Sequence, residues 1–166
     1  MITHLLDALQ LQLRTRADDI ALIVPVGDSP RSFSWQQLGR MIASVAGSLE
    51  FVWRDQSTIP RRLGHASDNS LADVLIALAS IVNAAVEVPI DHRLEAAEIE
   101  SRWNRMGGHW LAPQQRDELI AKALAAASDR QPLISLADFN EPAGRSRRDP
   151  DRPSLVLWTS GTTGNP

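Results

Sequence analysis

Hydroxyl and glycine residues fill the end of the chain, from Thr159 to Pro166. They follow an apolar run, Leu155 to Trp158, whose length and composition predict a buried strand. Glycines let the backbone approach an anion and point successive N–H groups at it, while short hydroxyl side chains add donors without bulk. A strand that runs into such a loop is therefore a candidate phosphate site, with the ligands Thr159, Ser160, Gly161, Thr162, Thr163 and Gly164.

Two better-known catalytic loops do not fit these residues. Gly161 and Gly164 are too close together for a Walker A loop, and no Gly-Lys-[Ser/Thr] follows them. Ser160 lies in Thr-Ser-Gly and not in Gly-x-Ser-x-Gly, so the pattern does not indicate a hydrolase nucleophile. A flexible tail rich in Ser, Thr and Gly, with no function, is also compatible with this composition.

The elements that must position the loop are read from hydrophobic periodicity. Helices are expected at 5–16, 34–52, 71–82, 94–106 and 114–128, and strands at 20–24, 62–66, 84–90, 109–112, 133–136 and 155–158. Ser34 with Gln37, and Ser70 with Asp73, have the spacing of capping boxes at the starts of two of these helices. This alternation predicts an α/β fold with a mainly parallel sheet flanked by helices. Residues 137–153 are polar and are expected to form a surface linker to the loop at 159–166.

Composition limits the class of protein. The 166 residues fit one domain or a large piece of one, and 43% hydrophobic with 22% charged residues is ordinary for a soluble fold. A net charge of −3 gives no reason to expect nucleic-acid binding. The most apolar stretch, Leu71 to Ile90, contains two acids, so no membrane span is predicted. The absence of cysteine and of a secretory signal fits a cytoplasmic protein.

Other reactive side chains have plainer explanations. The histidines His4, His65, His92 and His109 show no metal-ligand spacing and no nearby acid pair, so surface or strand positions are expected for them and no metal site is predicted. The arginines between Arg145 and Arg152 alternate with acids, which favours a solvated linker over a patch that attracts ATP. The tryptophans Trp35, Trp103 and Trp158 are expected to pack in the core.

The terminal loop resembles the ATP phosphate-binding motif of the adenylate-forming superfamily. Acyl-CoA synthetases, adenylation domains of nonribosomal peptide synthetases and luciferases carry the pattern [Thr/Ser]-Ser-Gly-Thr-Thr-Gly-x-Pro-Lys after an apolar strand, and Thr159 to Pro166 matches it up to the lysine. The likeness extends upstream. Phe33 to Leu38 is similar to the family's aromatic helix start, Leu63 to Ser70 to its strand ending in Asn-Ser, and Leu78 to Pro89 to its Ala-Gly-Ala-x-x-x-Pro segment, with Asn83-Ala84 in place of Ala-Gly.

This resemblance implies a two-step reaction. A carboxylate attacks the α-phosphate of ATP to give an acyl-adenylate and pyrophosphate, and a thiol of coenzyme A or of a carrier-protein pantetheine then takes the acyl group. The loop residues would grip the β- and γ-phosphates of Mg²⁺-bound ATP. The family's adenine, ribose and Mg²⁺ ligands and its catalytic lysine come later in the sequence, so no catalytic residue is expected within residues 1–166.

The whole chain is thus expected to be a single, truncated N-terminal portion of an AMP-binding domain. Taken alone it is expected to be inactive. It is also expected either to self-associate, through apolar surface and a strand edge at 154–159, or to have a disordered C-terminal end. A non-catalytic nucleotide-binding or interaction module of the same fold, and a structural domain with a fortuitous tail, remain alternatives. The acid, the acceptor thiol, the oligomeric state and the origin of the truncation stay open.

Overall fold

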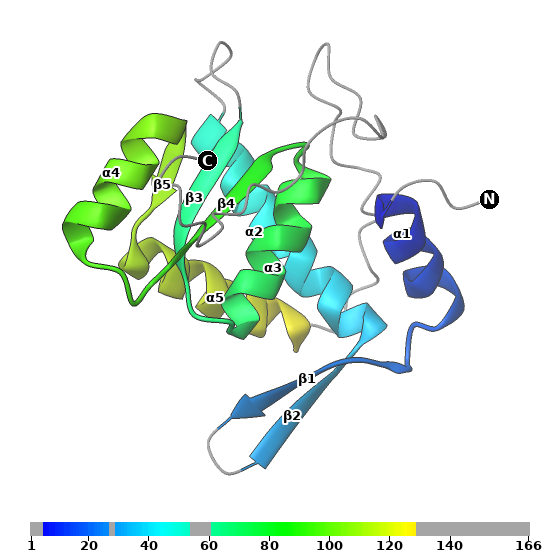
Figure 1. Cartoon of the computed structure of the whole chain (residues 1–166). Helices are drawn as coiled ribbons and strands as arrows, with labels where there is room; N and C mark the ends of the chain where they lie inside the picture. Colours follow the sequence, from blue (N-terminus) through cyan, green and yellow to red (C-terminus); the bar gives the residue numbers. More distant parts are fainter. Residues whose placement is uncertain (1–4, 27–28, 54–60, 129–166) are drawn as a thin grey trace.

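The computed structural model describes residues 5–26, 29–53 and 61–128 (Figure 1). The elements within these ranges alternate as the sequence predicts, and most of them begin and end within two residues of the expected positions. In chain order they are α1 Leu5–Thr15, β1 Ile20–Val26, β2 Ser29–Ser34, α2 Trp35–Trp53, β3 Arg62–Ser67, α3 Leu71–Val82, β4 Val86–Asp91, α4 Ala96–Met106, β5 His109–Leu111 and α5 Pro113–Ala127.

Three of the strands form a parallel sheet in the order β4-β3-β5. Helix α3 connects β3 to β4 on one side of it. Helix α4 then connects β4 to β5, which lies on the other side of β3. Because such crossovers are right-handed, they place α3 and α4 on opposite faces, as Figure 1 shows. The expected α/β fold with a parallel sheet flanked by helices is confirmed. The strands β1 and β2 form a separate antiparallel hairpin.

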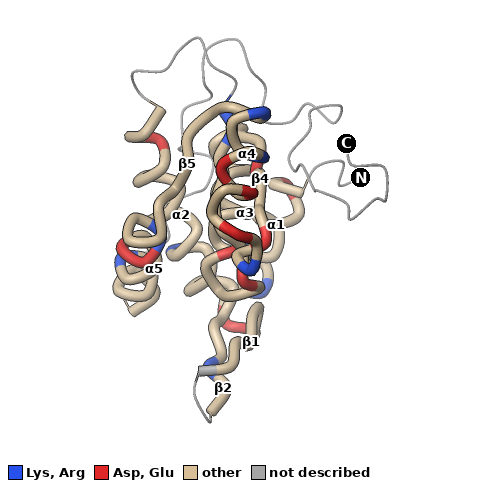
Figure 2. Tube along the Cα trace, turned by 60° about the vertical axis from the view of Figure 1, so that its left-hand side comes forward, with Lys and Arg blue, Asp and Glu red and all other residues tan. Residues whose placement is uncertain are grey.

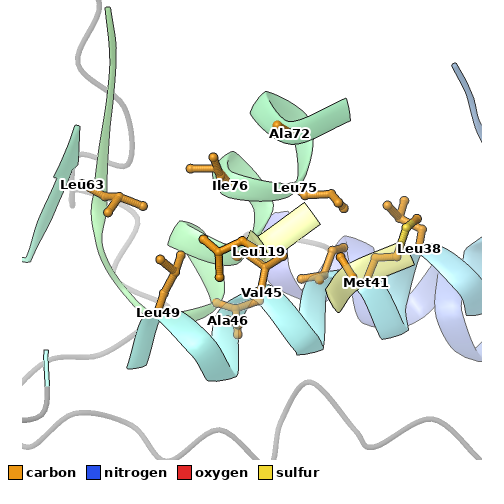
Figure 3. Packing of buried hydrophobic residues seen from close by; sticks show 14 of the residues in the cluster. Leu38, Met41, Val45, Ala46, Leu49, Leu63, Ala72, Leu75, Ile76 and Leu119 are labelled. Carbon is orange, nitrogen blue, oxygen red and sulfur yellow. The ribbon is translucent and has the colours of Figure 1, made fainter. Parts of the chain in front are cut away.

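The core lies on the face of the sheet covered by α2, α3 and α5. The apolar stripe predicted for α2 is buried along its length, and its side chains meet those of α3 and α5 (Figure 3). Met41, Val45 and Leu49 have no exposed surface. The start of this helix is a capping box, as predicted: the Ser34 amide donates to Gln37 Oε1 at 2.9 Å, and the Gln37 amide donates to Ser34 Oγ at 3.3 Å.

The opposite face is less well covered, and the expected burial of Trp103 is only partly met. No residue of α4 is fully buried, although Trp103 packs against Trp110 with ring centroids 5.6 Å apart. This approach depends on Gly64, because a Cβ there would lie 2.4 Å from Trp103 Cζ3. In the described part of the chain α4 is the helix on this face, and Trp103 is only half-buried.

Apolar side chains are also exposed on the β1–β2 hairpin and on α2. The β1–β2 hairpin projects away from the helices (Figure 1), and 62% of Ile20 and 59% of Ile23 are exposed. Phe51 on α2 is 71% exposed. Charged residues of both signs lie along α4 and α5 (Figure 2). Exposed apolar side chains favour association, so self-association stays a prediction. Within the described ranges no helix is long and apolar enough to span a bilayer.

The turn between α3 and β4 contains a strained alanine. Asn tolerates the left-handed conformation better than other non-glycine residues, but Asn83 has φ −86° and it is Ala84 that is left-handed, with φ 53°. Asn83 is held by its side chain, whose Nδ2 donates to Ala46 O at 2.8 Å. The strand therefore begins at Val86 and not at residue 84. An L-residue in this conformation costs about 1–2 kcal/mol relative to a right-handed one, a penalty that glycine does not have.

Replacing Ala84 with glycine should therefore raise the free energy of unfolding by about 1 kcal/mol. Urea denaturation followed by circular dichroism measures this change. Ala85→Gly is the matched control, because Ala85 is as well buried but has no positive φ, and it should destabilise by about 0.5–1 kcal/mol. A destabilised Ala84→Gly protein would show that the turn is not strained.

Candidate functional site

The carboxyl ends of the parallel strands form the edge where α/β sheets commonly bind ligands. On this edge β3 ends at Ser67, β4 ends at Asp91, and α3 begins after Ser70. Polar side chains gather here, and they are organised around one carboxylate, that of Asp73 on the first turn of α3.

Asp73 holds the turn between β3 and α3 together. Its Oδ2 accepts hydrogen bonds from Ser67 Oγ at 2.9 Å, from the Asp68 amide at 3.0 Å and from the Ser70 amide at 3.2 Å. Ser70 Oγ in turn accepts from the Ala72 amide at 3.2 Å, which completes the predicted capping box. A carboxylate at this position also interacts favourably with the helix dipole.

Arg116 joins α5 to the same turn. Its guanidinium donates to the Asp68 carboxylate, to Ser70 Oγ at 2.7 Å and to Asp73 Oδ1 at 3.0 Å. The hydrogen bond from Arg116 lowers the pKa of Asp68 from 3.8 to about 2, because it favours the ionised carboxylate. Helices α3 and α5 are thus fixed to the end of β3 by charge-assisted hydrogen bonds.

Because the pKa of Asp68 is lowered in the folded state, this carboxylate stabilises the fold above its unfolded pKa. That contribution should be lost as the pH falls from about 4 towards about 2. The difference in unfolding free energy between wild type and Asp68→Asn should therefore shrink between about pH 5 and about pH 2. Urea unfolding at each pH tests this, with Asp117→Asn on the exposed face of α5 as the control. A constant difference would contradict the pairing with Arg116.

The expected strand position is confirmed for His65, which lies in β3, but two acids that are distant in sequence lie beside it. His65 is fully buried, and its Nε2 is 2.9 Å from Glu87 Oε1 on β4. Its Nδ1 is 3.5 Å from Asp73 Oδ1. The sequence does not show the contact between His65 and Glu87, because Glu87 is 22 residues away and comes close only through the pairing of β3 with β4. The sequence feature that could have indicated the pair is an ionisable residue in the interior of each of two neighbouring strands, His65 in β3 and Glu87 in β4.

This arrangement suits support and not chemistry on a bound molecule. His65 has no exposed surface, so its ring cannot reach a substrate. Its two nitrogens lie beside different carboxylates, those of Asp73 and Glu87. Across residues 5–26, 29–53 and 61–128 no group of three or more His, Cys, Asp or Glu residues could hold a metal. The contacts among His65, Glu87, Asp73 and Arg116 hold this edge of the sheet in place.

The predicted phosphate ligands Thr159, Ser160, Gly161, Thr162, Thr163 and Gly164 lie outside the described residues. The same is true of the predicted strands at 133–136 and 155–158 and of the linker at 137–153. The role of the loop therefore stays a prediction from its sequence.

Solved structures similar to this chain share one architecture. The N-terminal subdomain of NpsA from Klebsiella oxytoca matches with a TM-score of 0.65 and 19% identity, over 97% of this chain and 40% of that one. Apo MatB from Rhodopseudomonas palustris matches with a TM-score of 0.65 and 20% identity, over 99% of this chain and 34% of that one. At these identities the likeness establishes the fold, which is that of the N-terminal part of adenylate-forming enzymes.

The chain therefore spans well under half the length of these two structures. None of the curated proteins compared with the chain matches it. The sequence model of one family, described as "AMP-binding enzyme", matches residues 9–166, which is nearly the whole chain and includes the loop. The chain belongs to the AMP-binding enzyme family.

Proposed function

We propose that this chain is the N-terminal part of an ATP-dependent ligase that activates a carboxylic acid as an acyl-adenylate and transfers the acyl group to a thiol. The observation that carries the proposal is the family match, which continues through the loop at 159–166. That loop combines the hydroxyls and glycines that phosphate binding needs. The confirmed fold, a parallel sheet with helices on both faces, supplies a strand edge suited to nucleotide binding.

Each residue of the loop has a part in this proposal. The amides around Gly161 and Gly164 and the hydroxyls of Thr159, Ser160, Thr162 and Thr163 hold the β- and γ-phosphates of ATP. Mg²⁺ accompanies the nucleotide and neutralises charge as pyrophosphate leaves. The loop therefore provides binding and charge stabilisation, and the groups that complete catalysis belong to other parts of the enzyme.

The ligands and domains named for similar structures support ATP as the nucleotide and a carrier protein as one possible acceptor. MatB from Rhodopseudomonas palustris has been solved with ATP bound, and a fatty acyl-adenylate ligase from L. pneumophila with acyl adenylate and pyrophosphate. NpsA-ThdA is an artificially fused adenylation and PCP di-domain. We propose either coenzyme A or a carrier-protein pantetheine as the acceptor, and the cytoplasm as the location.

Acid-dependent exchange of labelled pyrophosphate into ATP tests the proposal. The product of the complete reading frame should catalyse this exchange with at least one member of a panel of aliphatic and aromatic carboxylic acids, and only with Mg²⁺ present. Residues 1–166 alone should show no exchange. Binding of Mg-ATP without exchange for any acid would instead support a non-catalytic nucleotide-binding module, and a protein that neither binds nor exchanges would contradict both.

A further inference from the structure

The buried ring of His65 is surrounded by hydrogen-bond acceptors. On one side, Nε2 is 2.9 Å from Glu87 Oε1. On the other, Nδ1 is 3.3 Å from the backbone oxygen of Ala66 and 3.5 Å from Asp73 Oδ1. A neutral imidazole has one N–H and one lone pair, so either neutral tautomer would aim a lone pair at oxygen atoms. Only the imidazolium form donates on both sides.

The surrounding charges favour the same form. Glu87 on β4 and Asp73 on α3 are both ionisable acids, and their side chains are only 7% and 14% exposed. The guanidinium of Arg116 on α5 pairs with Asp73 Oδ1 at 3.0 Å.

We propose that His65 is held as an imidazolium and acts as a proton-dependent latch that joins β3 to β4 and to the first turn of α3. Along the latch the charges alternate: Glu87, His65, Asp73, Arg116 and Asp68. When the ring proton passes to solvent, Glu87 loses its cationic partner, whereas Asp73 keeps Arg116 and its hydrogen bonds from Ser67, Asp68 and Ser70. A buried carboxylate without a cationic partner is costly, so this edge of the sheet should loosen. The proposal is independent of ATP chemistry.

The protonation state can be observed directly by ¹⁵N NMR on the chain labelled only at histidine, at a concentration below that at which it associates. At neutral pH both ring nitrogens of His65 should carry protons, and His65→Gln identifies its signals among the four histidines. A proton on Nδ1 alone would place the second proton on Glu87 and overturn the proposal. A proton on Nε2 alone would also overturn it.

Variants of Glu87 test the link to packing. In Glu87→Gln the shape of the side chain is kept but the charge is lost, so His65 should give up one ring proton at neutral pH while circular dichroism shows a folded chain. Glu98→Gln, which removes an exposed partner of Arg102, should leave the His65 signals unchanged. If Glu87→Gln fails to fold, the wild-type spectrum still decides the protonation state. An unchanged imidazolium in a folded Glu87→Gln chain would show that Glu87 does not hold the proton.

Discussion

Replacing Glu87 with alanine should lower the free energy of unfolding by about 3–5 kcal/mol, because it leaves the buried ring of His65 without its closest partner. Chemical denaturation followed by circular dichroism measures the loss. The large effect is expected because the variant loses the buried hydrogen bond and charge pair between His65 and Glu87, and not because of the small volume of side chain removed.

The matched control is Glu98→Ala on α4. Glu98 pairs with Arg102 at 2.6 Å, but 46% of its side chain is exposed, so this change should cost under about 1 kcal/mol. Similar losses for the two alanine variants would mean that the His65–Glu87 pair contributes no more than an exposed ion pair.

Replacing Thr162 and Thr163 together with alanine should lower the rate of acid-dependent pyrophosphate exchange by about 10²–10³-fold, the usual effect of losing donors that stabilise developing charge. The reason is that both hydroxyls are proposed to hold the departing phosphates. The measurement uses the product of the complete reading frame with an acid that supports exchange in the wild type.

The control for this change is Thr15→Ala. Thr15 lies at the exposed end of α1, where its hydroxyl donates to Leu11 O at 2.8 Å, and its loss should leave exchange unaltered. A loop variant as active as the Thr15→Ala protein would remove the loop from the mechanism.

Local signals in the sequence predicted most of the described fold. The capping boxes of Ser34 with Gln37 and of Ser70 with Asp73 need only neighbouring residues, and both form as expected. The apolar stripe of α2 also depends only on helical periodicity, and it is buried. These features could be predicted because their causes lie within one or two turns of the chain.

Features that depend on distant residues could not be predicted in this way. Glu87 meets His65 because β3 and β4 pair in one particular register. Similarly, Arg116 reaches Asp68 and Asp73 only because α5 packs back toward the first turn of α3. No short sequence pattern contains this information, since the partners lie 22 to 48 residues apart.

Helix α4 shows a further reason why the sequence does not predict every feature of the fold. Its periodicity correctly predicts a helix with Trp103 on the apolar side, but the degree of burial depends on what else covers that face of the sheet. The identity of the left-handed residue in the turn before β4 also does not follow from local preference. Asn tolerates that conformation better than Ala, yet Asn83 has a negative φ and hydrogen-bonds to Ala46 O, and it is Ala84 that takes the strained position.

The proposed binding of the outer phosphates of ATP by the loop is tested most directly by isothermal titration of the product of the complete reading frame with Mg-ATP and, separately, with AMP. The Thr162→Ala, Thr163→Ala variant should bind Mg-ATP roughly a hundredfold more weakly than the wild type, because it lacks two hydrogen bonds to charged groups. Its affinity for AMP should be unchanged, since AMP has neither a β- nor a γ-phosphate. Equal affinities of wild type and variant for Mg-ATP, or an equal loss for both nucleotides, would contradict the account.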